Sequence, residues 1–331
     1  MALEHVSRLK RWFRIQEVPE ESFLGIYPYT NPAVIIHPYF WCIRKDHERF
    51  VRLRPRYRSV IAVDVADSDR LSDMAVNMAN LADAVVVPST WARAAFIRSG
   101  VSPPVYVVPH GLHPEFYRPK RPSTNSVVVA LREIKARYRV KYCLFFLWHS
   151  SRRKGADLVY KVMKRIQEER DDVVLVLKVA RHYEPIVKYL ARLRTLIVRG
   201  WMSISDLVDL YDTCDVYLLF SRGGGFELNG LEALARGLIV IAPEEGAWVD
   251  YLPKESLVKV AGYEPPLVGN PFHVGNGPVI DVEAAVDRLH EVLDDLDEWK
   301  ARYAIYADEA RRKFTWDRTA ELLASVISRH C

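Results

Sequence analysis

The residue types best suited to chemistry lie in the segment Asp215–Asp250, where an apolar run leads into three glycines and then into a helical pattern. The apolar run ends at Ser221, the glycines are Gly223–Gly225, and a helix is expected from about Glu227. Glycines at a strand-to-helix turn let the backbone approach a ligand closely, and the free N–H groups at a helix start favour an anion. The turn therefore predicts an anion site, although any tight turn can use glycines.

A polar cluster accompanies this turn. Glu227, Asn229 and Glu232 interrupt an otherwise apolar helix, and the last two share a helix face because they are three residues apart. Glu227 and Glu232 are about 140° apart around a helix, so both reach one ligand only if Glu227 precedes the first turn. The alternatives are that Glu227 only caps the helix and that Glu232 is a solvated carboxylate.

Basic and acidic groups follow other predicted strands. Arg152, Arg153 and Lys154 form a basic loop that opens a helix, a context that favours an anion site over a plain surface lysine. Lys178 lies at the end of a predicted strand and is a second candidate for contacting the phosphate of an anionic ligand at this site. In the first third of the chain, the strand Ser59–Val63 is followed by acidic residues, of which Asp64 and Asp67 are the candidates.

These groups must be positioned by alternating strands and helices. From about residue 130, short apolar runs alternate with segments whose apolar residues recur every three or four positions, which indicates a parallel sheet covered on both faces. The predicted strands here are Val173–Val179, Leu196–Val198, Val216–Phe220 and Leu238–Ile241, and the predicted helices are Ala156–Glu169, Ile204–Thr213 and Leu228–Arg236.

The first third repeats the pattern less cleanly. Its predicted strands are Leu24–Tyr27, Ala33–Ile36, Ser59–Val63, Ala84–Val87 and Val105–Val108, with helices near Asp73–Leu81 and Thr90–Ser99. The proline-containing stretch His113–Ser126 is interpreted as an interdomain linker. Two parallel-sheet domains joined in this way are expected to bind ligands between the carboxyl ends of their strands.

Composition narrows the function classes. A chain of 331 residues with 50% hydrophobic and 27% charged residues is typical of two globular domains rather than of disorder or coiled coil. We expect no secretory signal and no membrane-spanning segment. The four cysteines show no CxxC spacing, which favours a reducing cytoplasm over a zinc site or a disulfide framework.

The net charge of +5 lies wholly within residues 1–60, which hold 11 Lys and Arg against 6 Asp and Glu. Leu3, Val6, Leu9 and Phe13 form an apolar stripe among arginines and lysines, a pattern typical of an interfacial helix. We therefore expect this end to face the acceptor or an anionic membrane. A solvated basic surface and a helix packed on the core are the alternatives.

Five ordered segments of this sequence resemble glycosyltransferase family 4, the group 1 nucleotide-sugar glycosyltransferases with the GT-B fold. The segments are ADAVVVPSTWARAAFIRSGV with VYVVPHGLHPEFYRP (82–119), SRRKGADLVYKVMKRI (151–166), VRGWMSISDLVDLYDTCDVYLLFS (198–221), GFELNGLEALARGLIVIAPEEG (225–246) and FTWDRTAELL (314–323). Agreement in this order is much more specific than any one segment.

The resemblance implies an α/β fold of two Rossmann-like, doubly wound parallel-sheet domains that face an interdomain cleft. The first, on the acceptor side, would comprise residues 1–121 and the C-terminal helix 316–331, and the second, which binds the donor, residues 122–315. It implies a retaining transfer of a hexose from a nucleotide-diphosphate sugar to a hydroxyl of a glycan or lipid-linked acceptor, without a cofactor and without a metal ion for the chemistry. The leaving phosphate itself would help to deprotonate the acceptor.

The resemblance also assigns roles. Lys154, with Arg152 or Arg153, would contact the donor diphosphate, and Glu232 would hold the ribose hydroxyls. Phe226 and the glycine turn would complete the donor site. Independently of the resemblance, Trp201 follows Gly200 at a predicted strand end, where it would either cover the nucleotide base or pack. The sequence departs from the family at Gly224, where a glutamate is usual, and at Glu227, where a glycine is usual. We therefore expect Glu227 to orient the donor sugar.

Other functions remain open at this point. A sugar-nucleotide epimerase or a glycan phosphorylase would use the same fold, although no cofactor lysine for a phosphorylase is identified. A degenerate, non-catalytic sugar-nucleotide-binding protein is favoured by Gly224. Nucleic acid is not expected as a partner, because no aromatic residues interleave the basic ones. A glycosyltransferase that modifies nucleic-acid bases would combine the enzyme function with nucleic-acid binding.

Overall fold

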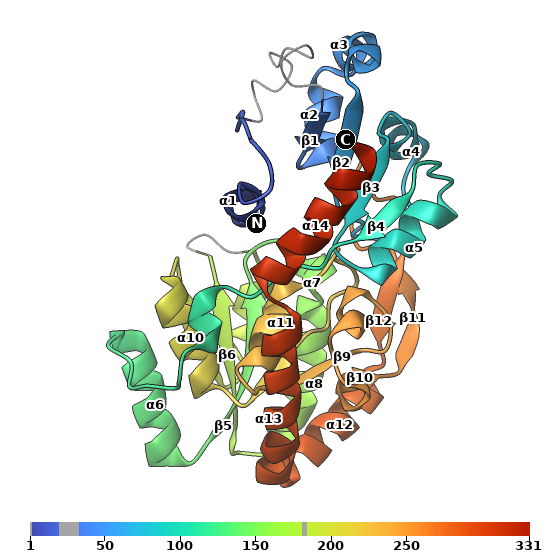
Figure 1. Ribbon diagram of the computed structural model, residues 1–331. Helices are drawn as coiled ribbons and strands as arrows, with labels where there is room; N and C mark the ends of the chain where they lie inside the picture. The colour runs from blue at the N-terminus through green and yellow to red at the C-terminus, as the bar shows by residue number, and fades with distance from the viewer. Residues whose placement is uncertain (1, 20–32, 181–183) are drawn as a thin grey trace.

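The computed structural model describes residues 2–19, 33–180 and 184–331, and it places two α/β domains one above the other (Figure 1). The predicted strand Leu24–Tyr27 lies outside the described residues. Both domains are built on parallel sheets, one of four strands and one of six, so the expected fold class is confirmed.

The N-terminal domain is a parallel sheet in the order β1–β2–β3–β4. Its strands are short apolar runs, as expected for a sheet that is covered on both faces. The strands and helices are α1 (Ala2–Leu9), β1 (Ala33–Ile36), α2 (Tyr39–Lys45), α3 (His47–Leu53), β2 (Ser59–Val63), α4 (Asp73–Ala79), β3 (Ala84–Val87), α5 (Thr90–Arg98) and β4 (Val105–Val107).

Different parts of the chain cover the two faces of this sheet. The connecting helices α2, α4 and α5 pack on one face, where Phe40, Ala75 and Phe96 join one buried cluster. The other face is covered by α14 (Trp316–His330), whose Leu323 packs in a second cluster with Ile61 of β2. The last helix of the chain therefore completes the core of the first domain (Figure 1).

The C-terminal domain holds a six-stranded parallel sheet in the order β10–β9–β8–β5–β6–β7. The chain runs from β5 outward to β7 and then returns to the other side of β5 through β8, which is the doubly wound pattern. The strands are β5 (Lys141–Leu147), β6 (Val173–Val179), β7 (Thr195–Arg199), β8 (Val216–Leu218), β9 (Ile239–Pro243) and β10 (Leu257–Val258).

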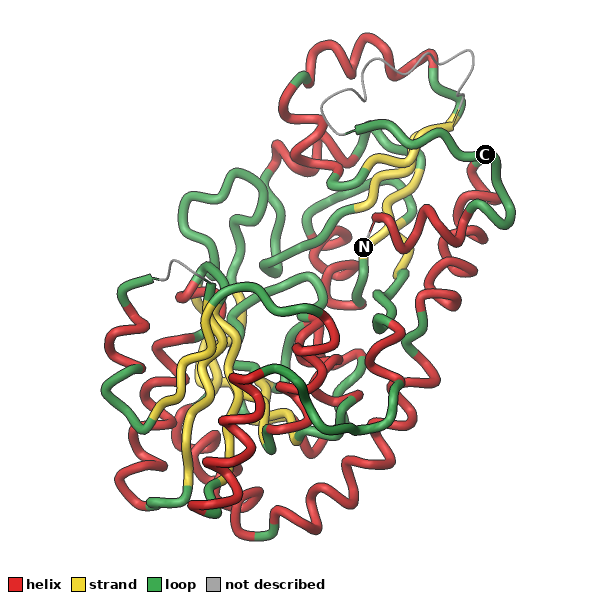
Figure 2. Tube along the Cα trace, turned by 90° about the vertical axis from the view of Figure 1, so that its left-hand side faces the viewer, coloured by secondary structure: helices red, strands yellow, loops and turns green. Residues whose placement is uncertain are grey.

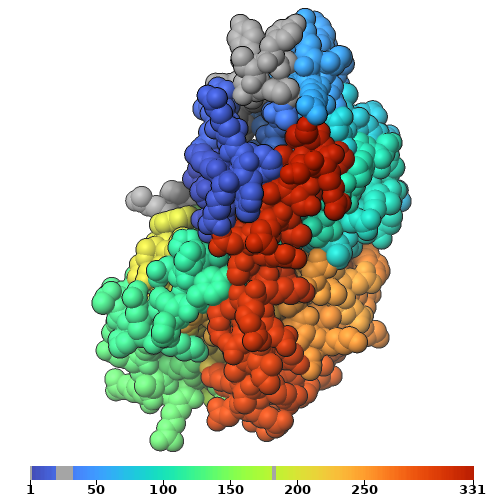
Figure 3. Space-filling view, in the orientation of Figure 1, coloured from blue at the N-terminus to red at the C-terminus, as the bar shows by residue number. Residues whose placement is uncertain are grey.

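Amphipathic helices cover both faces of this sheet, and α8 buries residues at three- and four-residue spacing, from Leu158 to Ile166. The helices are α6 (Ser126–Tyr138), α7 (Ser151–Lys154), α8 (Ala156–Glu169), α9 (Ile186–Leu190), α10 (Ile204–Thr213), α11 (Leu228–Ala235), α12 (Val282–Asp294) and α13 (Leu296–Lys313). The last of these leads directly into α14, and the pair runs along the face of both domains in Figure 3.

A hairpin of the C-terminal domain reaches into the N-terminal domain. It consists of β11 (Val260–Glu264) and β12 (Gly277–Ile280), and residues 271–276 of the loop between them contact the first domain. Phe272 in this loop is 1% exposed and stacks on Phe40 with ring centroids 5.3 Å apart. Ser72 donates its backbone N–H to the carbonyl oxygen of Phe272 at 2.8 Å. The hairpin therefore fastens the two domains at a second place besides α14.

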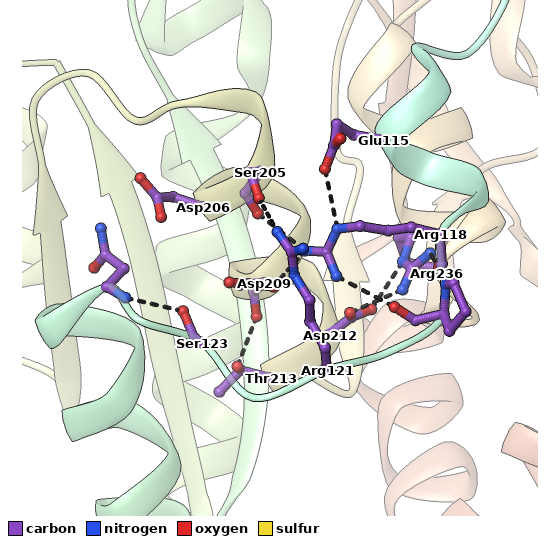
Figure 4. Close-up of polar contacts among 12 residues, drawn as sticks. Glu115, Arg118, Arg121, Ser123, Ser205, Asp206, Asp209, Asp212, Thr213 and Arg236 are labelled. Carbon is purple, nitrogen blue, oxygen red and sulfur yellow. Dashed lines mark hydrogen bonds and ion pairs between the residues drawn. The ribbon is translucent and has the colours of Figure 1, made fainter.

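The stretch predicted as a linker is tied to the C-terminal domain. After a 3-10 turn at Pro114–Tyr117, Arg118 contacts the carboxylate of Asp209 on α10, and Arg121 donates to Oγ of Ser205 at 2.6 Å (Figure 4). Arg236 holds the same stretch through the carbonyl oxygens of residues 116 and 118. The stretch is held on the second domain by these arginines, of which Arg118 reaches the buried carboxylate of Asp209.

Helix α1 packs on α14, as the tube trace also shows (Figure 2). Of the predicted apolar stripe, Leu9 is buried in the cluster formed with α14, whereas Leu3 remains exposed. Arg11 pairs with Asp317 at 2.7 Å. Helix α1 is therefore packed on the core, which was the alternative to an interfacial helix. It offers little apolar surface to a membrane.

Candidate functional site

The glycine turn between β8 and α11 is pressed against the N-terminal domain. A Cβ atom on Gly223 would lie 2.0 Å from the carbonyl oxygen of Asp67, and one on Gly225 would lie 2.5 Å from Cβ of Val65. Ser89 donates from Oγ to the carbonyl oxygen of Gly225 at 2.7 Å. Two of the three glycines are thus required by the close approach of the other domain, because a side chain there would collide with it.

Gly224 faces a side chain of its own domain instead. A Cβ atom at this position would lie 2.2 Å from Oε1 of Glu227. Glu227 has a φ of 59°, a left-handed conformation that is uncommon outside glycine, and its side chain makes no hydrogen bond that caps α11. The carboxylate instead fills the space that a side chain at position 224 would occupy, so the capping interpretation is wrong.

Two cations converge on the buried carboxylate of Glu227. Nη1 of Arg153 lies 3.1 Å from Oε1, the ammonium of Lys154 contacts Oε2, and Ser221 donates from Oγ to Oε1 at 3.2 Å. Burial alone would raise the pKa of Glu227, but Lys154 and Arg153 outweigh it and hold this pKa below its usual value. One ionised carboxylate against two cations leaves a net positive charge, which suits a phosphate ligand.

Helix α7 delivers these cations because it is seated on the end of β8. Gly155 ends α7 with a φ of 74°, and a Cβ atom there would lie 2.0 Å from the carbonyl oxygen of Phe220. Arg222 donates its backbone N–H to the carbonyl oxygen of Arg153 at 2.7 Å. The backbone contact fixes α7, and the positive φ makes glycine the favoured residue at its end.

The two arginines of the basic loop diverge. Arg153 is buried beside Glu227, whereas Arg152 is exposed and pairs with Glu264 at 3.0 Å. Lys178 also stays apart, because its ammonium contacts the carbonyl oxygen of Gly200. Arg153 is therefore the arginine that the structure brings together with Lys154.

Glu232 belongs to a second buried cluster. Its Oε2 accepts from the hydroxyl of Tyr211 at 2.9 Å and from Nδ2 of Asn229 at 3.4 Å. Burial raises the pKa of Glu232 to about 7, which the hydrogen bonds from Tyr211 and Asn229 partly oppose. The predicted shared face of Asn229 and Glu232 is thus present, and it lies apart from the partners of Glu227.

The acidic residues of the N-terminal domain take different positions. Asp64 is buried, accepts from the backbone N–H groups of Phe40 and Val65 at 2.7 and 2.8 Å, and has its pKa raised to about 7 by burial. Asp67 accepts from the N–H of Gly225 at 3.0 Å, so it is the acidic residue that meets the glycine turn. Nδ1 of His273 lies 3.4 Å from the N–H of Asp67.

Two predicted or possible site residues are packing residues instead. The ring of Phe226 is 3% exposed and lies against the rings of His110 and Tyr251 at 5.1 and 5.3 Å. Any part of Phe226 in ligand binding must therefore come from its backbone. His110 packs against the rings of Phe226 and Trp316, and burial lowers its pKa.

Several residues at this junction were missed by sequence reasoning. Ser89 and His273 reach the glycine turn and Asp67 from segments far away in the chain, and Tyr251 donates its hydroxyl to the carbonyl oxygen of Glu227 at 2.7 Å. Pairings over such separations leave no local pattern in one sequence. Arg222 alone carried a signal, as a charged residue inside the glycine turn, and it is buried in a bidentate pair with Asp157 at 2.8 Å.

Within residues 2–19, 33–180 and 184–331, no three His, Cys, Asp or Glu side chains are grouped so that they could hold a metal ion. In the same part of the chain, no helix combines the length and the apolar character needed to cross a membrane.

Comparison with known proteins identifies relatives of the donor-side domain and of the whole chain. The family model described as glycosyl transferases group 1 matches residues 141–264, which contain α7, the glycine turn and Glu232. Uncharacterized protein 356 of Sulfolobus islandicus rod-shaped virus 1 is 31% identical and covers 100% of this chain and 94% of its own length. A protein named as a candidate glycosyltransferase (number 45) of Sulfolobus islandicus filamentous virus is 30% identical over 60% of this chain, which spans about half of that protein (52%).

A solved structure has the same two-domain fold as this protein over nearly the whole chain. Sucrose-phosphate synthase from Thermosynechococcus elongatus superimposes with a TM-score of 0.66, covering 96% of this chain and 81% of that one at 17% identity. At 17% identity this likeness shows the fold alone. That fold, which contains the glycine turn, is of the GT-B type.

Proposed function

Because this chain belongs to the group 1 glycosyltransferases with the GT-B fold, we propose that it moves a hexose from a nucleotide-diphosphate sugar to a hydroxyl acceptor with retention of configuration. The observation that carries the proposal is the convergence of Arg153 and Lys154 at the glycine turn. Two cations around one carboxylate, at the carboxyl ends of parallel strands, form a site for a doubly charged ligand.

The proposed chemistry follows from the charges that develop. When the bond between sugar and diphosphate breaks, negative charge grows on the leaving group, and Lys154 and Arg153 stabilise it. The leaving phosphate accepts the proton of the acceptor hydroxyl, so no dedicated protein base is needed. Glu227 orients the donor sugar from the space above Gly224, and Glu232 holds the ribose.

The acceptor side of the reaction is assigned to the N-terminal domain. Asp67 touches the glycine turn through the N–H of Gly225, and it therefore orients an acceptor hydroxyl near the donor sugar. Asp64, held by two backbone N–H groups, fixes the loop that carries Asp67.

A lipid-linked acceptor would bring the protein to the cytoplasmic surface of an anionic membrane. In support, Trp41 on α2 and Val51 on α3 are exposed, Arg44 lies over the ring of Trp41, and Arg52 and Arg56 nearby in the chain are exposed as well. Exposed basic and aromatic side chains in one segment are typical of interfacial contact. Co-sedimentation with anionic vesicles but not with neutral ones is expected, and equal binding to both would contradict it.

The proposal is tested with a panel of nucleotide-sugars. A donor is expected to raise the melting temperature, because ligand binding stabilises the folded state by mass action. The same donor should then be hydrolysed or transferred, with the anomeric configuration of the product read by NMR. Retention is expected, and an inverted product would contradict the mechanism.

A non-catalytic sugar-nucleotide-binding protein is the second candidate. It is favoured by one observation, that Lys154 and Arg153 are already engaged by Glu227. Binding of a nucleotide-sugar without hydrolysis or transfer to any glycan or lipid acceptor would support this alternative.

A further inference from the structure

A pocket of about 380 Å³ lies at the amino end of the six-stranded sheet. Asp215, one of its lining residues, immediately precedes β8, and Gly237, another, lies two residues before β9. The glycine turn follows β8 at its other end. The pocket is therefore on the opposite edge of the sheet from the candidate donor site, and it is lined by a different set of residues.

Segments that are far apart in the chain form the wall of this pocket. The stretch between the domains contributes Lys120, α6 contributes Lys135, and α13 contributes Lys300 and Arg311. Arg236, the residue after α11, is the fifth basic residue of the wall. Three aspartates also line the pocket, and five cations against three carboxylates give a formal charge of +2.

One buried carboxylate serves two of the lysines. The side chain of Asp215 is fully buried, and Nζ of Lys135 lies 2.7 Å from its Oδ2 and Nζ of Lys300 lies 2.5 Å from its Oδ1. Burial alone would raise the pKa of Asp215, but the two lysines outweigh burial and hold this pKa below its usual value. The carboxylate is therefore ionised, and one of the two lysine charges is left over.

The two arginines have partners of their own. Arg236 is buried and forms a bidentate pair with Asp212, in which both nitrogen–oxygen distances are 2.8 Å (Figure 4). Arg311 pairs with the exposed carboxylate of Asp308. Each arginine is thus balanced by one aspartate, and neither adds to the excess of positive charge.

Lys120 supplies the second positive charge that the protein does not balance. In the part of the chain that the structure describes, no carboxylate pairs with its ammonium. Desolvation lowers the pKa of Lys120, Asp212 partly opposes this, and the positive charges of Arg236 and of nearby lysines lower it further. Because like charges held close together repel, an anion beside Lys120 would relieve this repulsion.

Charge and size together indicate the class of ligand. Lysine and arginine side chains are well suited to phosphate oxygens, and a phosphate monoester carries about two negative charges at neutral pH. This charge matches the excess on the pocket wall. The volume of about 380 Å³ lies within the range of small-molecule sites, about 300–1,000 Å³, which leaves room for a small organic group beside the phosphate.

We propose that this pocket is a second anion site, which binds a phosphate group either as the free ion or as the monoester of a small sugar. The proposal does not rest on the proposed transferase activity, because the two sites are lined by different residues. Lys120 lies in the stretch that joins the domains, and Lys300 lies on the helix that leads into α14. A phosphate between these two lysines links both chain connections between the domains.

The test measures the dissociation constants of inorganic phosphate and of glucose 6-phosphate for the full chain by calorimetry. The Lys154→Ala variant serves as the parent, because that substitution weakens phosphate binding at the candidate donor site. In this parent, Lys120→Ala is expected to weaken the binding of both probes about 10-fold or more, as for loss of one charge-assisted hydrogen bond, and Lys120→Glu should abolish it. Without either probe, both variants should melt no lower than the parent.

Lys164→Ala on α8 is the matched control, because that lysine is half exposed and pairs with Glu168 of its own helix. Tighter binding of glucose 6-phosphate than of phosphate would support the site with a monoester as its ligand, and equal or weaker binding would support it with the free ion. Binding that the Lys120 substitutions leave unchanged, or that falls equally in the Lys164 variant, would overturn the proposal. Loss of all phosphate binding in Lys154→Ala alone would also overturn it, because the candidate donor site would then account for that binding.

Discussion

The carboxylate of Glu227 joins residues that lie 73 and 74 positions away along the chain, Lys154 and Arg153. It does so from a left-handed backbone position, and it takes the volume vacated by the side chain that Gly224 lacks. A carboxylate therefore lies in the proposed donor site, three residues later in the sequence than the family resemblance implies. If a donor phosphate binds there, the charge balance of the proposed site depends on which of the two cations that phosphate contacts.

Lys154→Ala is expected to weaken donor binding and to lower kcat/KM by about 10- to 100-fold, because hydrogen bonds between charged groups contribute about 1.5–3 kcal/mol. Calorimetry and steady-state kinetics measure the two effects. Lys164→Ala on α8 is the control, because that lysine is half exposed and pairs only with Glu168 on its own helix. Unchanged affinity and rate in the Lys154 variant would remove this lysine from the site.

Glu227→Gln is expected to lower stability near neutral pH by up to about 3 kcal/mol, since it leaves the buried Arg153 and the partly buried Lys154 without their counter-charge. The folded-state pKa of Glu227 lies below the ordinary value of 4.5. The carboxylate therefore stabilises the protein above that pH, and this contribution is lost as the pH falls through the lower, folded-state value. The stability gap between the two proteins should close in acid.

Denaturant unfolding at a series of pH values measures this gap. Glu168→Gln on the exposed face of α8 is the matched control and should show almost no gap at any pH. A gap for Glu227→Gln that does not change between neutral and acidic pH would show that the ion pairs with Lys154 and Arg153 do not stabilise the fold.

At this scale, sequence reasoning identified residue types better than their partners. The motif resemblance pointed to Lys154, which is the last residue of α7, and to Glu232, which lies within α11. It did not choose between Arg152 and Arg153, because two adjacent residues of a short helix point in different directions. Nor did it find His273, which is brought to Asp67 by a hairpin from the other domain.

Among the elements, several of the C-terminal domain were predicted closely because they are uniformly apolar or regularly periodic, although β5 and β10 were not among the predicted strands. The predicted Val173–Val179, Ala156–Glu169 and Ile204–Thr213 coincide with β6, α8 and α10. Helix α6 was not expected, since it begins inside the stretch interpreted as a linker. The β11–β12 hairpin was also missed, because its loop is rich in glycine and proline and resembles any surface loop.

The β11–β12 hairpin gives a prediction of its own. Phe272→Ala is expected to destabilise the protein by about 3–5 kcal/mol, because it leaves a cavity against Phe40 and Phe96 in the core of the other domain. Denaturant unfolding measures the loss, and hydrogen exchange should rise in α2 and α4. Val268→Ala in the same loop is the control, because that side chain is 81% exposed. A loss below about 1 kcal/mol would mean that the hairpin only rests on the N-terminal domain.

The whole molecule is held together by segments that cross between its domains. The α14 helix crosses from the second domain to the first, the β11–β12 hairpin does the same on another side, and Thr90 of α5 bonds to Asp250 at 2.7 Å through its backbone N–H. The glycine turn lies between these crossings, pressed on the loop of Asp67. The geometry of the candidate site therefore depends on the docking of both domains and not on either one alone.

The dependence of the first domain on the last helix can be tested at Leu323, which is 1% exposed between α14 and β2. Leu323→Ala is expected to destabilise the protein by about 2–5 kcal/mol, because the methyl groups it removes are buried against a rigid sheet. Hydrogen exchange should rise in β2 and β3, although the substitution lies more than 200 residues later in the chain. Ser325→Ala, exposed on the same helix, should leave both quantities unchanged. If exchange rises only within α14 itself, the helix is an appendage that frays independently, and the N-terminal sheet does not need it.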